Sequence, residues 1–393
     1  MVDKIKFIVE NIRIAEDILQ DKKLYTKQNK RKNKEWFVFD YKKLELLHFF
    51  RYKNEDAITA NQKTDDDNDE DDDEKGYINE DQQFVNKNYK NLSIVFVRNI
   101  GSKQGKLIVH QNLRKDYIRI KEKHGKGILN DLDYDAFVET INTYALQFKI
   151  SKPDFWNAAK ITKIELGVTM QFKSNMVSIL SCFGKYDNVP EKFIYGNSGI
   201  SYKAENFSVS IYDKLKRALQ NRELLKTLTK TRREEYRKLA NKSVYYLRFE
   251  LRVDSVSKFN QEAFKGRINT LIGLRENWDI ILKSLHNLLD NISFADFLSP
   301  KMEKALLSAK LSESKSKADF DDFMYYLAIK SQKNMELFNT YISKLLPNQI
   351  SSGYLKKIER GYNRFVEMEE NRYSEIFNKK FEDKIKKLMK SGG

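Results

Sequence analysis

Residues 160–170 read KITKIELGVTM, residues 206–214 read NFSVSIYDK and residues 244–253 read VYYLRFELRV. Apolar and polar residues alternate in each segment, which is the period of a β-strand with one buried face. Val209 and Phe249, for example, fall on the apolar side of their segments. The three segments therefore predict strands of one sheet whose apolar face meets a core and whose polar face points away from it.

The polar faces of these strands carry the residue types of a site that processes phosphodiesters. They present Glu165, Glu250, Tyr212, Lys214, Arg248, Arg252 and Lys163. Two carboxylates can bind a hard divalent cation such as Mg²⁺ or Mn²⁺, a tyrosine hydroxyl can act as a covalent nucleophile, and basic side chains can hold a phosphodiester. Each residue also has a structural interpretation, as a cross-strand charge pair or a packed aromatic ring. The functional prediction depends on their meeting on one face.

The rest of the chain divides into a strand-rich part and a helical part. Further strands are expected at 37–39, 91–98 and 106–110, and helices at 44–50, 133–148 and 214–240. From residue 258 the pattern is helical to the end, with helices expected at 264–291, 300–314, 318–345 and 351–390. This order predicts an α+β fold, an antiparallel sheet with helices followed by a C-terminal helical domain.

We expect four regions along the chain. Residues 1–55 form the N-terminal part of a catalytic region, 56–76 an acidic disordered loop, 77–257 the catalytic domain and 258–393 the helical domain. The helical domain has two interpretations, a module that binds a partner or duplex DNA and the plain core of a helical bundle.

The net charge points to a polyanionic partner. The 393 residues include 72 Lys and Arg against 56 Asp and Glu, a net charge of +16, although nine of the acids lie in one run at 65–74. Without that run the chain is near +25, a charge that attracts nucleic acid. The acidic segment is interpreted as a solvated linker. The alternative is a DNA mimic that covers the basic surface until substrate displaces it.

Several classes of site are missing from the sequence. A single cysteine, Cys182, rules out a disulfide framework and a cysteine-built zinc site. The four histidines show no HxxxH or HxH spacing, and no GxxxxGK[ST] phosphate loop occurs. No apolar run approaches the ~18 residues of a membrane span, and no signal-like segment opens the chain. We therefore expect a cytoplasmic protein, in a reducing compartment and not bound to a membrane, that does not hydrolyse ATP through a phosphate loop.

Several motifs in order resemble those of a known family. SVSIYDKLKRA (208–218) and YYLRFELRV (245–253) resemble the replication initiators of filamentous phages and the rolling-circle initiators of small plasmids, together with related relaxases. KITKIELGV (160–168), KLIVHQNLRKDYI (106–118) and FKISKPD (148–154) fit the same order, and the first resembles the version found in Bacteroidetes initiators. The resemblance covers most of 90–290.

The resemblance implies a fold like that of the HUH endonucleases and a DNA-nicking activity. In that family an antiparallel sheet carries a metal site and a tyrosine that nicks one DNA strand at a specific site, leaving a covalent 5′-phosphotyrosine. By the same resemblance Tyr212 is the nucleophile, Lys214 is the motif lysine and a second catalytic residue, and Glu165 and Glu250 are the acids near the metal. The paired histidines of the HUH group are missing, and Glu165 replaces the commoner aspartate.

The remaining assignments complete this hypothesis. His110, on the expected strand 106–110, is a candidate third metal ligand, and Arg248, Arg252 and Lys163 are candidate DNA contacts. The expected partners are single-stranded or cruciform origin DNA and a host helicase and polymerase, with Mg²⁺ or Mn²⁺ as cofactor. The alternatives are a non-catalytic nucleic-acid-binding protein of the partition or nucleoid type, a relaxase of a mobile element, and a structural protein of a virion.

Overall fold

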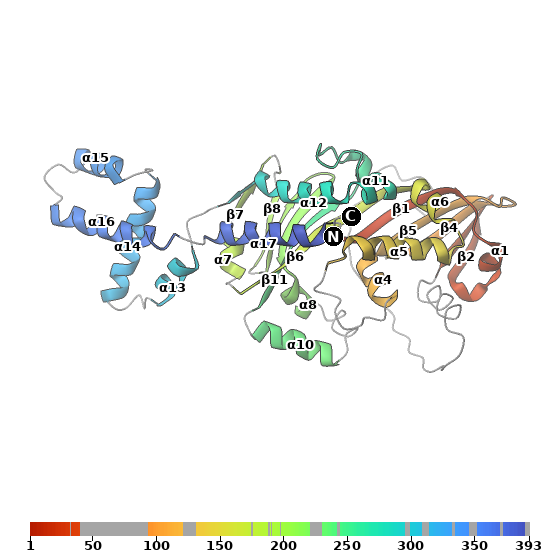
Figure 1. The fold of residues 1–393 in the computed structure, drawn as a ribbon, viewed down its shortest axis with the longest axis horizontal. Helices are drawn as coiled ribbons and strands as arrows, with labels where there is room; N and C mark the ends of the chain where they lie inside the picture. The colour runs from red at the N-terminus through yellow and green to blue at the C-terminus, as the bar shows by residue number, and fades with distance from the viewer. Residues whose placement is uncertain are drawn as a thin grey trace.

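The computed structural model contains one large antiparallel sheet with helices packed on it (Figure 1). It describes residues 1–31, 33–39, 93–120, 131–173, 176–187, 189, 191–196, 198–220, 230–241, 244–294, 299–308, 314–331, 335–345, 352–369 and 372–389. The ten strands, in spatial order, are β2 (Tyr25–Arg31), β3 (Lys34–Phe39), β4 (Ser93–Asn99), β5 (Gly105–Asn112), β1 (Val2–Ile12), β6 (Ala159–Phe172), β11 (Tyr245–Val253), β10 (Phe207–Asp213), β9 (Gly199–Lys203) and β8 (Glu191–Tyr195).

The three strands predicted from residues 160–170, 206–214 and 244–253 are confirmed as neighbours. β11 pairs antiparallel with β6 on one side and with β10 on the other. Their alternation also predicts the buried face, because every apolar position of β11 is fully buried: Leu247, Phe249, Leu251 and Val253. These strands lie inside the sheet with their apolar face under the helices, which explains why most side chains on that face are large aliphatic or aromatic ones.

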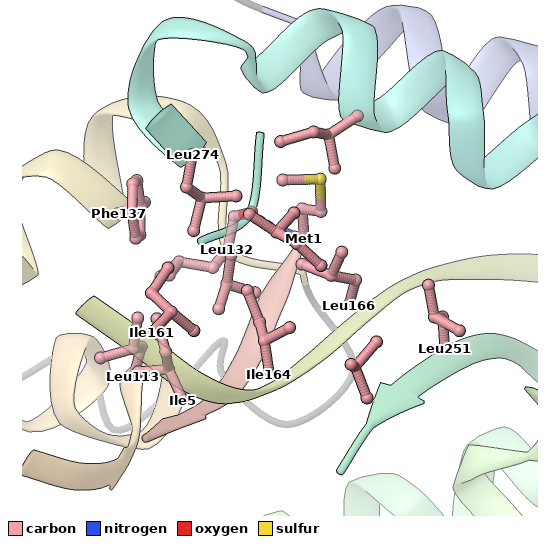
Figure 2. Close-up of a cluster of buried hydrophobic side chains, with 14 of the residues drawn as sticks. Met1, Ile5, Leu113, Leu132, Phe137, Ile161, Ile164, Leu166, Leu251 and Leu274 are labelled. Carbon is pink, nitrogen blue, oxygen red and sulfur yellow. The ribbon is translucent and has the colours of Figure 1, made fainter. Parts of the chain in front are cut away.

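Helices cover the apolar face of the sheet. They are α5 (Tyr134–Gln147), α6 (Lys152–Ala158), α7 (Met176–Ser181), α11 (Leu271–Glu276), α12 (Trp278–Asn287) and α17 (Tyr373–Leu388). Figure 2 shows side chains of β1 and β6, among them Ile5 and Ile164, meeting Phe137 of α5 and Leu274 of α11. The helix expected over 133–148 begins where predicted, because the Asp133 carboxylate caps it by accepting from the Ala136 amide.

The C-terminal part is helical, as expected, but it contributes to two cores. The helices α13 (Pro300–Ser308), α14 (Ser314–Ser331), α15 (Met335–Leu345) and α16 (Ser352–Val366) lie beyond one end of the sheet in Figure 1. Three of them bury Met302, Phe323 and Phe365 in a small core of their own. α11, α12 and α17 instead share the core of the sheet, so that core does not end at the expected boundary at residue 258.

Shorter elements complete the described chain. They are α1 (Glu16–Gln20), η1 (Lys22–Leu24), α4 (Leu113–Ile120), β7 (Phe183–Tyr186), α8 (Lys214–Gln220), α10 (Lys230–Asn241), η2 (Val256–Lys258), η3 (Leu288–Asn291) and β12 (Ile292–Phe294). The helix expected at 44–50 and the acidic segment 56–76 lie outside the described residues. Within the described ranges, no helix is both long enough and apolar enough to span a membrane.

Candidate active site

The polar face of the sheet lies opposite the six covering helices, and α8 packs on it beside Tyr212. This face brings the predicted tyrosine and acids together. In the β10–β11 register Tyr212 lies opposite Arg248, and Ser210 lies opposite Glu250. On the other side of β11, the strand β6 places Glu165 opposite Arg252. Directly opposed residues of antiparallel strands share a face, so Tyr212, Glu250 and Glu165 lie on one surface, as the alternation predicts.

Tyr212, Glu250 and Arg248 form a hydrogen-bonded chain. The Tyr212 hydroxyl donates to Glu250 Oε2 at 3.0 Å, and Arg248 Nε donates to the same oxygen at 2.8 Å. Arg248 is fully buried and also pairs with Asp131 at 3.0 Å and Asp3 at 2.8 Å, so its guanidinium is fixed. An activated nucleophile typically donates a hydrogen bond to a base, and a third group holds that base in position. Tyr212, Glu250 and Arg248 have this arrangement.

The environment of Tyr212 keeps its phenol protonated in the resting protein. Burial, followed by the negative charge of Glu250, raises the pKa of Tyr212 above its ordinary value of 10.0. Attack by the hydroxyl oxygen therefore needs a proton acceptor in contact with it, and the Glu250 carboxylate is in that position. The exposed Arg217 guanidinium of α8 lies over the Tyr212 ring, 4.9 Å from its centroid, which puts a cation at the solvent side of the phenol.

Arg248 lies beneath the polar face rather than on it. It is 0% exposed, and the absence of a side chain at Gly167 makes room for it, because a Cβ there would lie 2.6 Å from a guanidinium nitrogen. The DNA contact predicted for Arg248 is therefore corrected: this guanidinium pairs with three carboxylates, the buried ones of Asp3 and Asp131 and the partly exposed one of Glu250.

Lys214, the motif lysine expected to take part in catalysis, is also buried. Its Nζ donates to Thr169 Oγ1 at 3.1 Å, and the residue is 6% exposed. Burial, and then the charges of Arg114 and Arg248, lower the pKa of Lys214 well below its ordinary value. Lys214 therefore positions the network around Arg248 and does not face an incoming phosphate.

Glu165 and Glu250 form a pair of mutually repelling acids. Glu165 pairs with Lys4 Nζ at 3.5 Å, yet burial, followed by the charge of Glu250, raises the pKa of Glu165 to about 7. Two oxygen ligands of this kind fit Mg²⁺ or Mn²⁺, which keep several waters and take further oxygens from a substrate phosphate. Within the described ranges no three His, Cys, Asp or Glu side chains gather closely enough to hold a metal by themselves.

His110 does not join the two acids as a third ligand. β1 lies between the histidine's strand β5 and β6, and Lys6 of β1 stands opposite both His110 and Lys163. Strands two positions apart are about 10 Å apart, so His110 and Glu165 are separated by a row of lysines. Burial, and then the charges of Lys6, Lys4 and other cations, lower the pKa of His110 to about 4. The prediction of His110 as a ligand is corrected accordingly.

The other two predicted DNA contacts do lie on the polar face. The side chain of Arg252 is 40% exposed and donates to Asp254 at 2.9 Å, and Lys163 is partly exposed on β6. A surface ion pair of this kind contributes little, so a phosphate can take the place of Asp254 at little cost. Arg252 thus remains a candidate contact.

Some residues of this surface were not predicted from the sequence. Lys4 and Lys6 lie on β1, a strand that the alternation in VDKIKFIV (2–9) would have revealed. Asp131 and Arg217 carry no local signal, because each reaches the site from a different element of the fold. No family model, curated protein or solved structure matches the chain.

Proposed function

We propose that this protein is a site-specific DNA endonuclease and strand transferase that starts rolling-circle replication, with a sheet that works in the manner of the HUH endonucleases. The observation that carries the proposal is the hydroxyl of Tyr212 donating to a carboxylate, Glu250, that the buried Arg248 holds in place. The order of motifs described above supports the same assignment. A relaxase of a mobile element would use the same chemistry.

The proposed reaction is a transesterification at phosphorus. The Tyr212 oxygen attacks the phosphorus while its proton passes to Glu250, and the bond from phosphorus to the 3′-oxygen breaks. The products are a 5′-phosphotyrosine and a strand that ends in a 3′-hydroxyl once its oxygen takes up a proton. The phosphodiester energy is kept in the adduct, so the reaction consumes no ATP, and the reverse attack by a 3′-hydroxyl reseals the strand.

Glu165 and Glu250 are the residues that would hold a divalent cation. A bound Mg²⁺ or Mn²⁺ supplies positive charge that stabilises the negative charge developing on the phosphoryl oxygens. Arg217 adds a cation on the solvent side of Tyr212. Glu165 has its pKa raised to about 7, so its carboxyl is partly protonated near neutral pH, and it ionises fully when a cation lies beside it.

The polar face supports binding of single-stranded or cruciform origin DNA. Lys4, Lys6, Lys163 and Arg252 lie on it in adjacent rows of β1, β6 and β11. The large excess of basic residues over acids supports the same partner. In this proposal the exposed 3′-hydroxyl primes a host polymerase, and a host helicase opens the duplex, because the sequence has no phosphate loop of its own.

The experiment is a nicking assay with Tyr212→Phe and the matched control Tyr246→Phe. Tyr246 lies on the same face of the neighbouring strand, so both variants lose one hydroxyl from the same surface. The substrate is a supercoiled plasmid carrying the DNA that flanks the gene, with Mn²⁺. We expect Tyr212→Phe to lose nicking and adduct formation and Tyr246→Phe to retain both. Nicking that persists in Tyr212→Phe would leave a non-catalytic DNA-binding protein, or another nucleophile, as the explanation.

A further inference from the structure

Two exposed aromatic rings lie at the edge of the sheet beside the candidate site. Phe193 and Tyr195 belong to β8, the last strand of the sheet, and are 43% and 58% exposed. Tyr195 lies opposite Gly199 of β9, which in turn lies opposite Tyr212. Tyr195 therefore shares one cross-strand row with the candidate nucleophile, and its ring is on the polar face.

Phe193 occupies the neighbouring row on the same face. It lies opposite Ser201, which lies opposite Ser210, and Ser210 lies opposite Glu250. The two serine hydroxyls share a hydrogen bond of 2.9 Å, so they lie flat against the sheet. Phe193 and Glu250 thus stand at opposite ends of a row whose middle consists of two small side chains.

Only small residues stand between the edge rings and Tyr212. Gly199 has no side chain, and a Cβ there would lie 2.7 Å from the Cβ of Tyr212, so no larger residue fits. β8 and β10 are two strands apart, about 10 Å. The structure therefore has a low floor of glycine and serine, with aromatic rings along one side and Tyr212 and Glu250 along the other.

Basic side chains border this floor. Lys203 of β9 lies opposite Ser208, and Ser208 lies opposite Arg252, which places both cations on the polar face. Lys203 is exposed, and the Arg252 side chain is 40% exposed. Exposed aromatic rings next to a basic surface are typical of sites that hold unpaired bases by stacking and their phosphates by charge. Duplex DNA does not offer its base faces in this way.

We infer that Phe193 and Tyr195 stack on unpaired bases of the single strand whose phosphate reaches Tyr212. The floor of Gly199, Ser201 and Ser210 places only small side chains between the edge rings and Tyr212. The inference rests on the proposed function, because it names the surface that presents single-stranded DNA to the same tyrosine. It also makes a separate claim about binding, which is measurable without any cleavage.

The experiment measures the affinity of the full chain for a short fluorescein-labelled oligothymidylate by anisotropy, without divalent cations. We expect Phe193→Ala and Tyr195→Ala each to weaken binding roughly 5- to 150-fold, the range for loss of one stacked base. Tyr195→Phe keeps the ring and is expected to bind like the wild type. Ile194→Ala is the matched control, since Ile194 is 66% exposed on the same strand but alternates to the other face. Circular dichroism checks that each variant is folded.

An oligomer of abasic sugar phosphates separates stacking from charge. We expect the wild type, Phe193→Ala and Tyr195→Ala to bind it equally, because it has no bases to stack. The inference would be overturned if the wild type did not bind oligothymidylate, or if the wild type and both alanine variants bound it with equal affinity. It would also be overturned if the wild type self-associated and both alanine variants did not, because β8 would then form an interface between two copies of the chain. A wild type that stacks bases but never nicks a plasmid would leave this inference standing and remove the proposed function.

Discussion

The raised pKa of Glu165 predicts a stability that falls as the pH rises. The carboxyl has a pKa of about 7 in the folded protein against an ordinary 4.5, because it is buried beside Glu250. Below pH 4.5 the carboxyl is protonated in both the folded and the unfolded state, so it does not affect the free energy of unfolding. Between pH 4.5 and 7 the carboxyl ionises readily only in the unfolded state, so the free energy of unfolding falls as the pH rises. Above pH 7 the ionised carboxylate lowers the free energy of unfolding by about 3 kcal/mol. This is the shift of the pKa from 4.5 to about 7 multiplied by about 1.36 kcal/mol per pKa unit.

The assay is unfolding of the wild type and Glu165→Gln in guanidinium at several pH values, with tryptophan fluorescence as the signal. All three tryptophans, Trp36, Trp156 and Trp278, are buried in the sheet and its covering helices, so the signal reports on this part of the fold. We expect the variant to be more stable than the wild type by about 3 kcal/mol at pH 8 and to lose the advantage near pH 4.5. Glu262→Gln, at an exposed carboxylate, is the control and is expected to follow the wild type.

Mn²⁺ extends the same experiment to the proposed cation site. A cation that binds between Glu165 and Glu250 only in the folded state stabilises that state by RT ln(1 + [Mn²⁺]/Kd). We therefore expect Mn²⁺ to stabilise the wild type at pH 8 and to have little effect on Glu165→Gln. A wild type and a variant that show the same pH dependence would refute the reasoning, since Glu165 would then not be held in a repelling pair.

Two further predictions separate the buried arginine from the exposed one. Arg248→Met is expected to lower the free energy of unfolding by about 3–5 kcal/mol, because it leaves the buried carboxylates of Asp3 and Asp131 without their cation. Guanidinium unfolding measures this loss, and a loss under about 1 kcal/mol would contradict the buried network. Arg252→Met is expected to change the free energy of unfolding by less than about 1 kcal/mol. In a salt titration it is expected to reduce the slope of log affinity for single-stranded DNA against log salt concentration by about 0.7. An unchanged slope would show that Arg252 does not contact the DNA.

The strands that carry the site were predictable because alternation is a local property. The period of two in 160–170, 206–214 and 244–253 assigns each side chain to a face, and the structure confirms both the faces and the strand pairing. The strand β1 was equally open to prediction from its alternating residues 2–9. The short strands β8 and β9 have five residues each, with too few alternations to be distinguished from loops.

Burial and strand order are not local, and they account for the corrections. Alternation assigns Arg248 to the polar face but does not reveal that Asp3 and Asp131, far away in the sequence, enclose it. His110 falls short of Glu165 because β1, from the start of the chain, is inserted between their strands. The C-terminal helix α17 likewise returns to the sheet, where Leu388 accepts a hydrogen bond from Trp278 of α12. Such contacts follow from the whole fold.

The most direct measurement of the central claim is mass spectrometry of the protein after reaction with supercoiled plasmid DNA and digestion by nuclease and trypsin. The tryptic peptide 204–214 reads AENFSVSIYDK, and its single tyrosine is Tyr212. The account predicts that this peptide gains the mass of a nucleotide 5′-phosphate on Tyr212, in proportion to the DNA nicked. Nicked DNA with an unmodified 204–214 peptide, or with the nucleotide on Tyr202, Tyr245 or Tyr246, would contradict it.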